Sequence, residues 1–165
     1  VFSRSIPYNG LPTLYGDMGV FGTGALAILE DEKELLRAYS YPIGSYAVGL
    51  DARGVATTFV REFQMTVRQV VADFGVTRNG NIDWSKLSRT VRNLWDRGLH
   101  EQSIDVTWIV TPRVNALYDS PFAKDMPWAS CWYENGAEDG RFLRESGYRQ
   151  FPFLVPRWEA AGGGT

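Results

Sequence analysis

Alternation of apolar and polar positions predicts that most of the chain forms short β-strands. The three-residue turn Ala52-Arg53-Gly54 separates two such runs and predicts a β-hairpin, because glycine tolerates the backbone of tight turns. The segment 9–19 is rich in glycine and polar turn residues and predicts a loop or a short helix, and 112–126 predicts a loop. The predicted strands are 22–30, 35–41, 46–51, 55–63, 104–110, 128–134, 142–145 and 151–155.

Two segments instead show the period of an amphipathic helix. In the first, at about 66–75, Thr66 and Gln69 have the spacing of a capping box, and Gly75 stands where a C-cap is expected. The apolar positions that follow the cap lie three or four residues apart, as one helix face requires. They are Val67, Val70, Val71 and Phe74.

The second predicted helix spans about 83–98, from near Asp83 to Gly98. Its apolar stripe consists of Trp84, Leu87, Val91, Leu94 and Trp95. Its basic side chains lie mostly on the other side of the helix. They are Lys86, Arg89, Arg92 and Arg97.

The order of elements predicts an α+β fold with mostly antiparallel sheet, because strands and helices do not alternate as they do in βαβ units. The 165 residues, 44% of them hydrophobic, suit one compact domain over 1–165. No stretch reaches the roughly 18 to 20 apolar residues of a membrane span, so we expect no membrane partner.

Few residues favour catalysis or metal binding. One Cys and one His exclude Cys-based zinc sites and His-rich metal ligation, and we expect no metal and no cofactor. His100 follows a helix end, where a cap or surface role is commoner than that of a catalytic base. Gly22-x-Gly24 lacks the Lys and third Gly of a phosphate loop and predicts a flexible strand start. A hydrolase that uses two carboxylates as acid and base stays an alternative, but no spacing of Asp and Glu favours it.

The tryptophans allow a second class of function. Exposed and coplanar rings would form a platform in a carbohydrate- or receptor-binding module rich in β-structure. Their places on apolar stripes and alternating strands favour core burial instead. The residues concerned are Trp95, Trp108, Trp128, Trp132 and Trp158.

Charge is unevenly distributed along the chain. Residues 1–52 carry three basic and six acidic groups, 53–113 carry nine and six, and 114–165 carry five and seven. The net charge of -2 argues against a tight, sequence-independent DNA clamp, which needs a strongly basic face. The basic face of the second helix fits a solvated surface, or a contact with an acidic neighbouring subunit or a passing phosphate.

Several short segments, in this order, resemble the head-to-tail connecting (portal) proteins of short-tailed double-stranded DNA phages and prophages. The resemblance covers most of the chain, and no single segment is diagnostic alone. The segments are 20–28, 41–46, 60–63, 69–75, 145–148, 151–153 and 156–158.

This resemblance implies a structural protein of the virion and not an enzyme. Portal proteins form a ring, usually of twelve subunits, at one capsid vertex, assembled in the bacterial host cytoplasm. Double-stranded DNA passes through the channel during packaging and ejection without sequence-specific binding. The implied partners are further copies of the chain, the terminase that hydrolyses ATP, and capsid and tail or adaptor proteins.

Family members are longer, with stem and clip regions that are not visible here. We therefore expect this chain to be the wing-like α+β part of a portal that continues after 156–158 and does not form a ring by itself. The basic middle segment, flanked by two acidic ones, predicts salt bridges between subunits. The predicted interface residues are Arg61, Arg68, Lys86, Arg89, Arg92 and Arg97.

Overall fold

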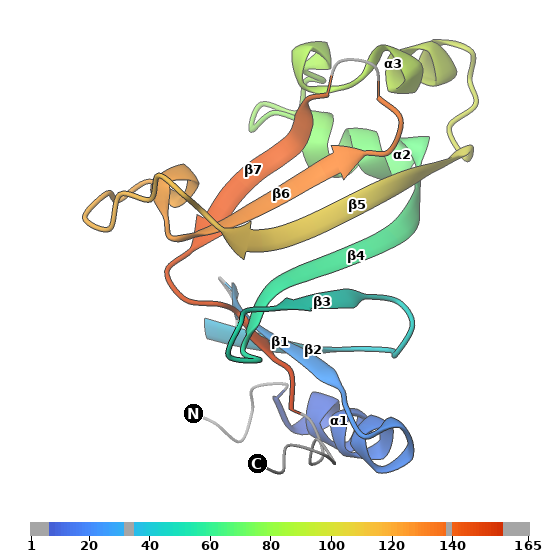
Figure 1. Ribbon diagram of the computed structural model, residues 1–165. Coiled ribbons are helices and arrows are strands. Elements are labelled where there is room, and N and C mark those ends of the chain that lie inside the picture. Colours follow the sequence, from blue (N-terminus) through green and yellow to red (C-terminus); the bar gives the residue numbers. More distant parts are fainter. Residues whose placement is uncertain (1–6, 32–34, 138–139, 157–165) are drawn as a thin grey trace, which may run out of the picture. The chain divides into compact units, whose positions relative to one another are not determined.

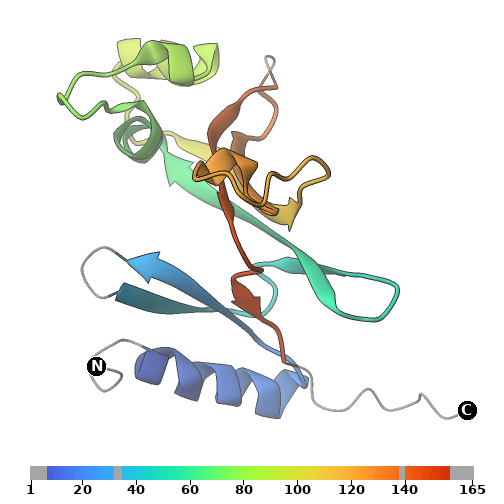
Figure 2. The ribbon, with the colours of Figure 1, turned by 90° about the vertical axis from the view of Figure 1, so that its left-hand side faces the viewer.

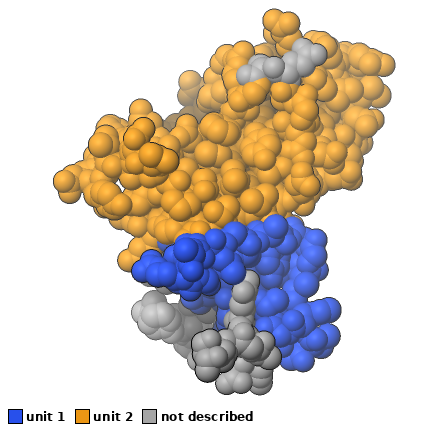
Figure 3. Space-filling model, in the orientation of Figure 1, with its two compact units in different colours: residues 1–56, 151–165 blue, residues 57–150 orange. Residues whose placement is uncertain are grey.

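The chain forms an α+β fold with antiparallel sheets, which confirms the predicted fold class. The computed structural model (Figure 1) describes residues 7–31, 35–137 and 140–156. The chain is divided into two compact units, which Figure 3 shows in blue and orange. Unit 1 comprises residues 1–56 and 151–165, and unit 2 comprises residues 57–150. The interpretation of residues 1–165 as one domain stays a prediction.

Unit 1 contains a three-stranded antiparallel sheet with a helix along one face (Figure 2). The helix occupies the segment predicted as a loop or short helix, and its Leu14 packs with Leu26 and Ala38 in the core. Gly24 permits this approach, since a Cβ there would come within 2.6 Å of Leu14 Cδ1. The strands lie in the order β2-β1-β8. The elements are α1 (Pro7–Phe21), β1 (Ala25–Asp31), β2 (Leu35–Tyr41) and β8 (Phe153–Leu154).

The predicted turn between the third and fourth strands is also present. It joins β3 (Ala47–Leu50) to β4 (Ala56–Thr66). A carboxylate oxygen of Asp51 accepts hydrogen bonds from the amides of Arg53 and Val55, each at 2.9 Å. Gly54 has a φ of 77°, a conformation that favours glycine.

Unit 2 contains β4 to β7 in the order β4-β5-β6-β7, antiparallel throughout. The long strand β5 pairs with β4 from Ser103 to Val110 and with β6 from Val106 to Pro112. A loop with the short 3-10 turn η3 (Ala123–Asp125) connects β5 to β6. The strands not yet defined are β5 (Ser103–Pro112), β6 (Trp128–Glu134) and β7 (Phe142–Tyr148).

The helix predicted at 66–75 is α2 (Val67–Val70) continued by one π-helical turn, η1 (Val71–Gly75). The Thr66 hydroxyl accepts from the Gln69 amide at 3.3 Å, and Gln69 Oε1 accepts from the Thr66 amide at 2.8 Å, which confirms the capping box. The C-cap prediction was wrong, because Val76 ends this helix. Gly75 is buried instead, and a Cβ there would lie 2.7 Å from Leu87 Cδ1.

The helix predicted at about 83–98 is present, but it is divided into two parts. A 3-10 turn, η2 (Trp84–Lys86), comes first, and α3 (Arg89–Asp96) begins only after a break. Asp83 caps η2 and Ser88 caps α3, and a cap residue takes extended backbone angles that a helix interior does not allow. Leu87 is extended too, at φ -108° and ψ 151°, and is buried in the core. Gly98, at φ 75°, follows α3 as predicted.

The core of unit 2 lies between these helices and the sheet. Val67, Val70 and Val91 are fully buried, as their helical spacing predicts. The core also includes Met65, Val71, Phe74, Leu87, Ile104, Val106 and Leu143. The helical segment 67–96 is therefore held against one end of the sheet.

Candidate functional site

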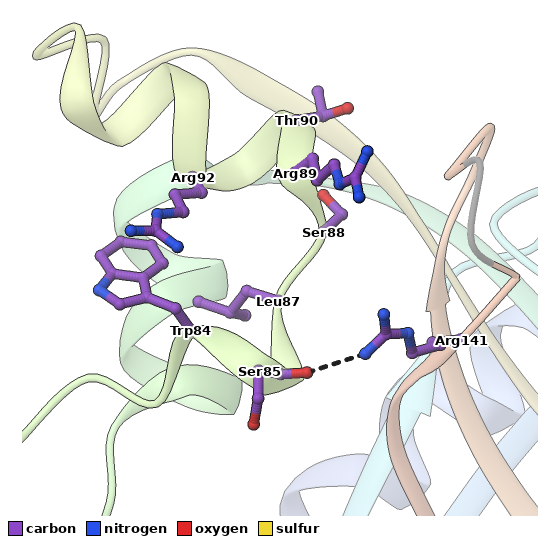
Figure 4. Close-up of a pocket in the computed structure, with 8 residues that line it drawn as sticks. All are labelled: Trp84, Ser85, Leu87, Ser88, Arg89, Thr90, Arg92 and Arg141. Atoms are coloured by element: carbon purple, nitrogen blue, oxygen red, sulfur yellow. Dashed lines mark hydrogen bonds between the residues drawn. The ribbon is translucent and has the colours of Figure 1, made fainter.

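A pocket of about 430 Å³ opens in unit 2 beside η2, α3 and the start of β7 (Figure 4). None of the described residues that line it carries a carboxylate, whereas three carry a guanidinium group. Such a pocket favours an anionic group that can accept several charge-assisted hydrogen bonds. The lining residues are Trp84, Ser85, Leu87, Ser88, Arg89, Thr90, Arg92 and Arg141.

The break between η2 and α3 positions two of these arginines. The Ser88 hydroxyl accepts from the Val91 amide at 3.0 Å, which fixes the first turn of α3. Arg89 and Arg92 lie three residues apart, so they share one side of that helix. The guanidinium carbon of Arg92 lies 5.7 Å from the ring centre of Trp84, within cation–π range.

The third arginine comes from a distant part of the sequence. Arg141 immediately precedes β7, and its Nη1 donates to the carbonyl oxygen of Ser85 at 3.2 Å. Figure 4 shows this hydrogen bond at the edge of the pocket. Sequence reasoning missed Arg141, because only the folding of β7 beside η2 brings it to this position.

The six arginines and lysines predicted as interface residues do not form one cluster. Arg89 and Arg92 share the pocket, and Arg92 lies 3.9 Å from Asp96. The other four are placed elsewhere by local contacts. Two of them form ion pairs: Arg68 Nε lies 2.8 Å from Glu101, and Lys86 lies 3.7 Å from Asp83. The guanidinium of Arg61 lies 4.8 Å from the Phe63 ring centre. Arg97 is the exposed C-cap of α3.

Next to the pocket, Asp83 is held in its ionised form. Hydrogen bonds from the hydroxyl and the amide of Ser85, with a smaller effect of the Lys86 charge, lower the pKa of this carboxyl. Its Oδ1 accepts from the Ser85 hydroxyl at 2.6 Å and from the Ser85 amide at 3.1 Å. This carboxylate therefore serves as the N-cap of η2.

His100, which was weighed as a catalytic base, and the one cysteine, Cys131, both have structural surroundings. The His100 ring stacks on Trp95, with ring centres 4.2 Å apart, and its Nε2 lies 3.2 Å from the Trp95 carbonyl oxygen. Cys131 is buried, and burial together with the Glu145 charge raises the pKa of its thiol. No group of three or more His, Cys, Asp or Glu residues is arranged to hold a metal ion within the described ranges 7–31, 35–137 and 140–156.

The tryptophans contribute mainly to packing. Trp108 is 3% exposed and stacks on half-buried Trp132, with ring centres 5.0 Å apart and planes 18° apart. Trp95 and Trp128 are half-buried, and Trp158 lies outside the described residues. No finding supports a carbohydrate- or receptor-binding platform. Among the helices that the structure describes, none is long and apolar enough to cross a membrane.

Comparison with known proteins identifies the family. The family described as "Bacteriophage head to tail connecting protein" matches residues 1–165, and the chain belongs to this family. The chain is 39% identical over 162 residues to the portal protein of Salmonella phage epsilon15 and 38% identical over 163 residues to the probable portal protein of Bordetella phage BPP-1. These alignments cover 98% and 99% of the chain but 28% of each relative. The resemblance drawn from the sequence is thereby confirmed.

Proposed function

We propose that this chain is the wing-like part of a subunit in a phage portal ring, through which double-stranded DNA enters and leaves the capsid. The observation that carries the proposal is the match of the whole chain to the connecting-protein family and to two portal proteins. The role is structural and not enzymatic, with ATP hydrolysis left to a terminase partner. The subunits, twelve in the usual portal, assemble in the host cytoplasm and remain in the virion with capsid and tail proteins.

The modest charge is consistent with DNA that moves through the channel. A net charge of -2 and a pocket with only a few arginines give little of the counterion release that tight DNA binding requires. This part of the protein is therefore not expected to hold DNA tightly, and the proposed role needs no sequence-specific contact.

We also propose that Arg89 and Arg92 act at the contact between subunits. They share a pocket whose described lining carries no carboxylate, so an acidic group from a neighbour would complete it. The other four predicted interface residues do not line this pocket, and we assign them peripheral roles in the contact; they are Arg61, Arg68, Lys86 and Arg97.

Negative-stain electron microscopy of the protein expressed from its whole reading frame tests the ring. We expect rings with an axial channel wide enough for duplex DNA. Discrete monomers at high protein concentration would overturn the proposal.

A further inference from the structure

The loop between β5 and β6 exposes four large apolar side chains within nine residues. The exposed fractions are 97% for Val114, 61% for Leu117, 73% for Tyr118 and 62% for Phe122. Single exposed apolar residues are ordinary, but a concentration of them on one loop marks an interaction surface. We call residues 114–122 the apolar loop.

Hydrogen bonds hold the apolar loop in a defined conformation. The Leu117 amide donates to the Asp125 carbonyl oxygen at 2.9 Å, and the Ser120 hydroxyl donates to the Asp125 carboxylate at 2.6 Å. At the base of the loop, Arg113 forms a 2.7 Å ion pair with Glu145 and donates to the Met126 carbonyl oxygen at 3.2 Å. The loop is thus ordered before it meets a partner, which lowers the entropy cost of binding.

The charge of the apolar loop complements that of the arginine pocket. Asp119 is the only charged residue of 114–122. It is exposed and forms no hydrogen bond or ion pair with any residue that the structure describes. The pocket presents Arg92 beside the Trp84 ring, and Arg89 lines another part of it. An acidic residue next to a tyrosine fits such a site, because arginine binds carboxylates and aromatic rings pack on indole.

The loop and the pocket lie at opposite ends of the unit 2 sheet (Figure 1). Strand β5 begins at Ser103 beside the helices and ends at Pro112, where the loop starts. Ten residues of strand span roughly 30 Å. The loop therefore does not reach the pocket of its own unit, and only the loop of another copy of the chain could enter it. A contact between two different surfaces repeats from copy to copy and closes into a ring when the rotation permits.

From these observations we infer that the apolar loop of one copy enters the arginine pocket of the next copy around the ring. The Asp119 carboxylate accepts hydrogen bonds from Arg89 and Arg92, and the Tyr118 ring packs against Trp84. This inference rests on the proposed portal function and names the residues that join neighbouring subunits.

Cysteine cross-linking in the protein expressed from its whole reading frame tests the contact. Asp119→Cys is combined with Thr90→Cys, which lines the pocket but carries no charge. Mild oxidation, or a short bis-maleimide linker, is expected to give a ladder of covalent oligomers on denaturing gels. Each single variant, and Asp119→Cys with the exposed Arg78→Cys outside the pocket, is expected to give none.

The outcomes separate this contact from the proposed function. Rings in the microscope without the specific ladder would overturn the loop-to-pocket contact and leave the portal function standing. Absence of rings from the unmodified protein would overturn both.

A charge-reversal experiment tests the same contact if the double-cysteine variant does not assemble. Asp119→Arg is expected to raise the protein concentration needed for rings about tenfold, and adding Arg89→Asp is expected to restore it. Normal assembly of Asp119→Arg would overturn the contact and would point to another partner for the loop, such as a capsid or tail protein.

Discussion

The α-carbon of Gly147 faces the carbonyl oxygen of Trp128 so closely that a Cβ would lie 2.8 Å from that oxygen. Such a Cβ would also overlap the Ala123 carbonyl oxygen and lie 3.0 Å from the Met126 Cβ. Since backbone atoms form two of these contacts, they relieve a clash less easily than the end of a flexible side chain. Gly147 therefore lets the base of the β5–β6 loop lie against β7.

Replacing Gly147 by Ala is expected to displace this loop. Overpacking of this kind typically costs about 1–3 kcal/mol of stability. Hydrogen exchange should become faster at the Leu117 and Arg113 amides, which now donate to the Asp125 and Pro127 carbonyl oxygens. Gly19→Ala is a suitable control, because nothing lies within 4 Å of a Cβ there. Unchanged exchange in Gly147→Ala would contradict the role assigned to this glycine.

The start of α3 depends on Ser88, and Ser88→Ala is expected to destabilise the protein. Loss of an N-cap hydroxyl costs about 1 kcal/mol, and this side chain is 8% exposed, so little water replaces the hydrogen bond to the Val91 amide. A urea-unfolding series on Ser88→Ala and Ser88→Thr measures the effect. The threonine variant keeps the hydroxyl and should lose less stability. Equal losses would show that packing, and not the cap, matters at this position.

Local patterns predicted the strands well because their physical causes are local. Strand 35–41 was predicted with the observed bounds, since a charged stretch precedes it in the sequence and Pro42 follows it. The capping box at Thr66 was found for the same reason, because both partners lie within one turn. Gly75 was misread because its role is to make room for Leu87, a contact between two elements that sequence spacing does not show.

The candidate site was only partly accessible from the sequence. Helical spacing brought Arg89 and Arg92 together correctly, but it also grouped them with Lys86 and Arg97, which the break after η2 and the end of α3 place elsewhere. Arg141 joins the pocket through strand pairing. The apolar residues of the β5–β6 loop show no periodicity, so their exposure became evident only with the fold.

Alkaline pH is expected to destabilise the folded protein. Burial raises the pKa of the Tyr148 phenol, against smaller lowering effects of Ser130 and Arg144, and burial also raises the pKa of the Cys131 thiol above its ordinary value of 9.0. The folded state then keeps protons that the unfolded chain releases. The contribution of these two groups to the free energy of unfolding is fully present below pH 9 and is lost as the pH rises above this value.

Urea midpoints measured from pH 7 to pH 11 test this dependence. Tyr148→Phe and Cys131→Ala each remove one titrating group, so each variant should show a shallower alkaline decline than the unmodified protein. Identical slopes for all three proteins would assign the decline to other groups.

Charge reversal at Arg89 and Arg92 tests the proposed subunit contact from the pocket side. The double variant Arg89→Glu and Arg92→Glu places carboxylates where the neighbour's Asp119 is expected, so repulsion replaces attraction and ring assembly should be impaired. The control is Arg78→Glu with Arg149→Glu, two exposed residues of the same unit that do not line the pocket and that give the same change in net charge. Ring fractions from electron microscopy, compared at matched ionic strength, should fall in the first variant alone, and added salt should reduce the difference. Normal rings from Arg89→Glu with Arg92→Glu would exclude this pocket from the subunit contact.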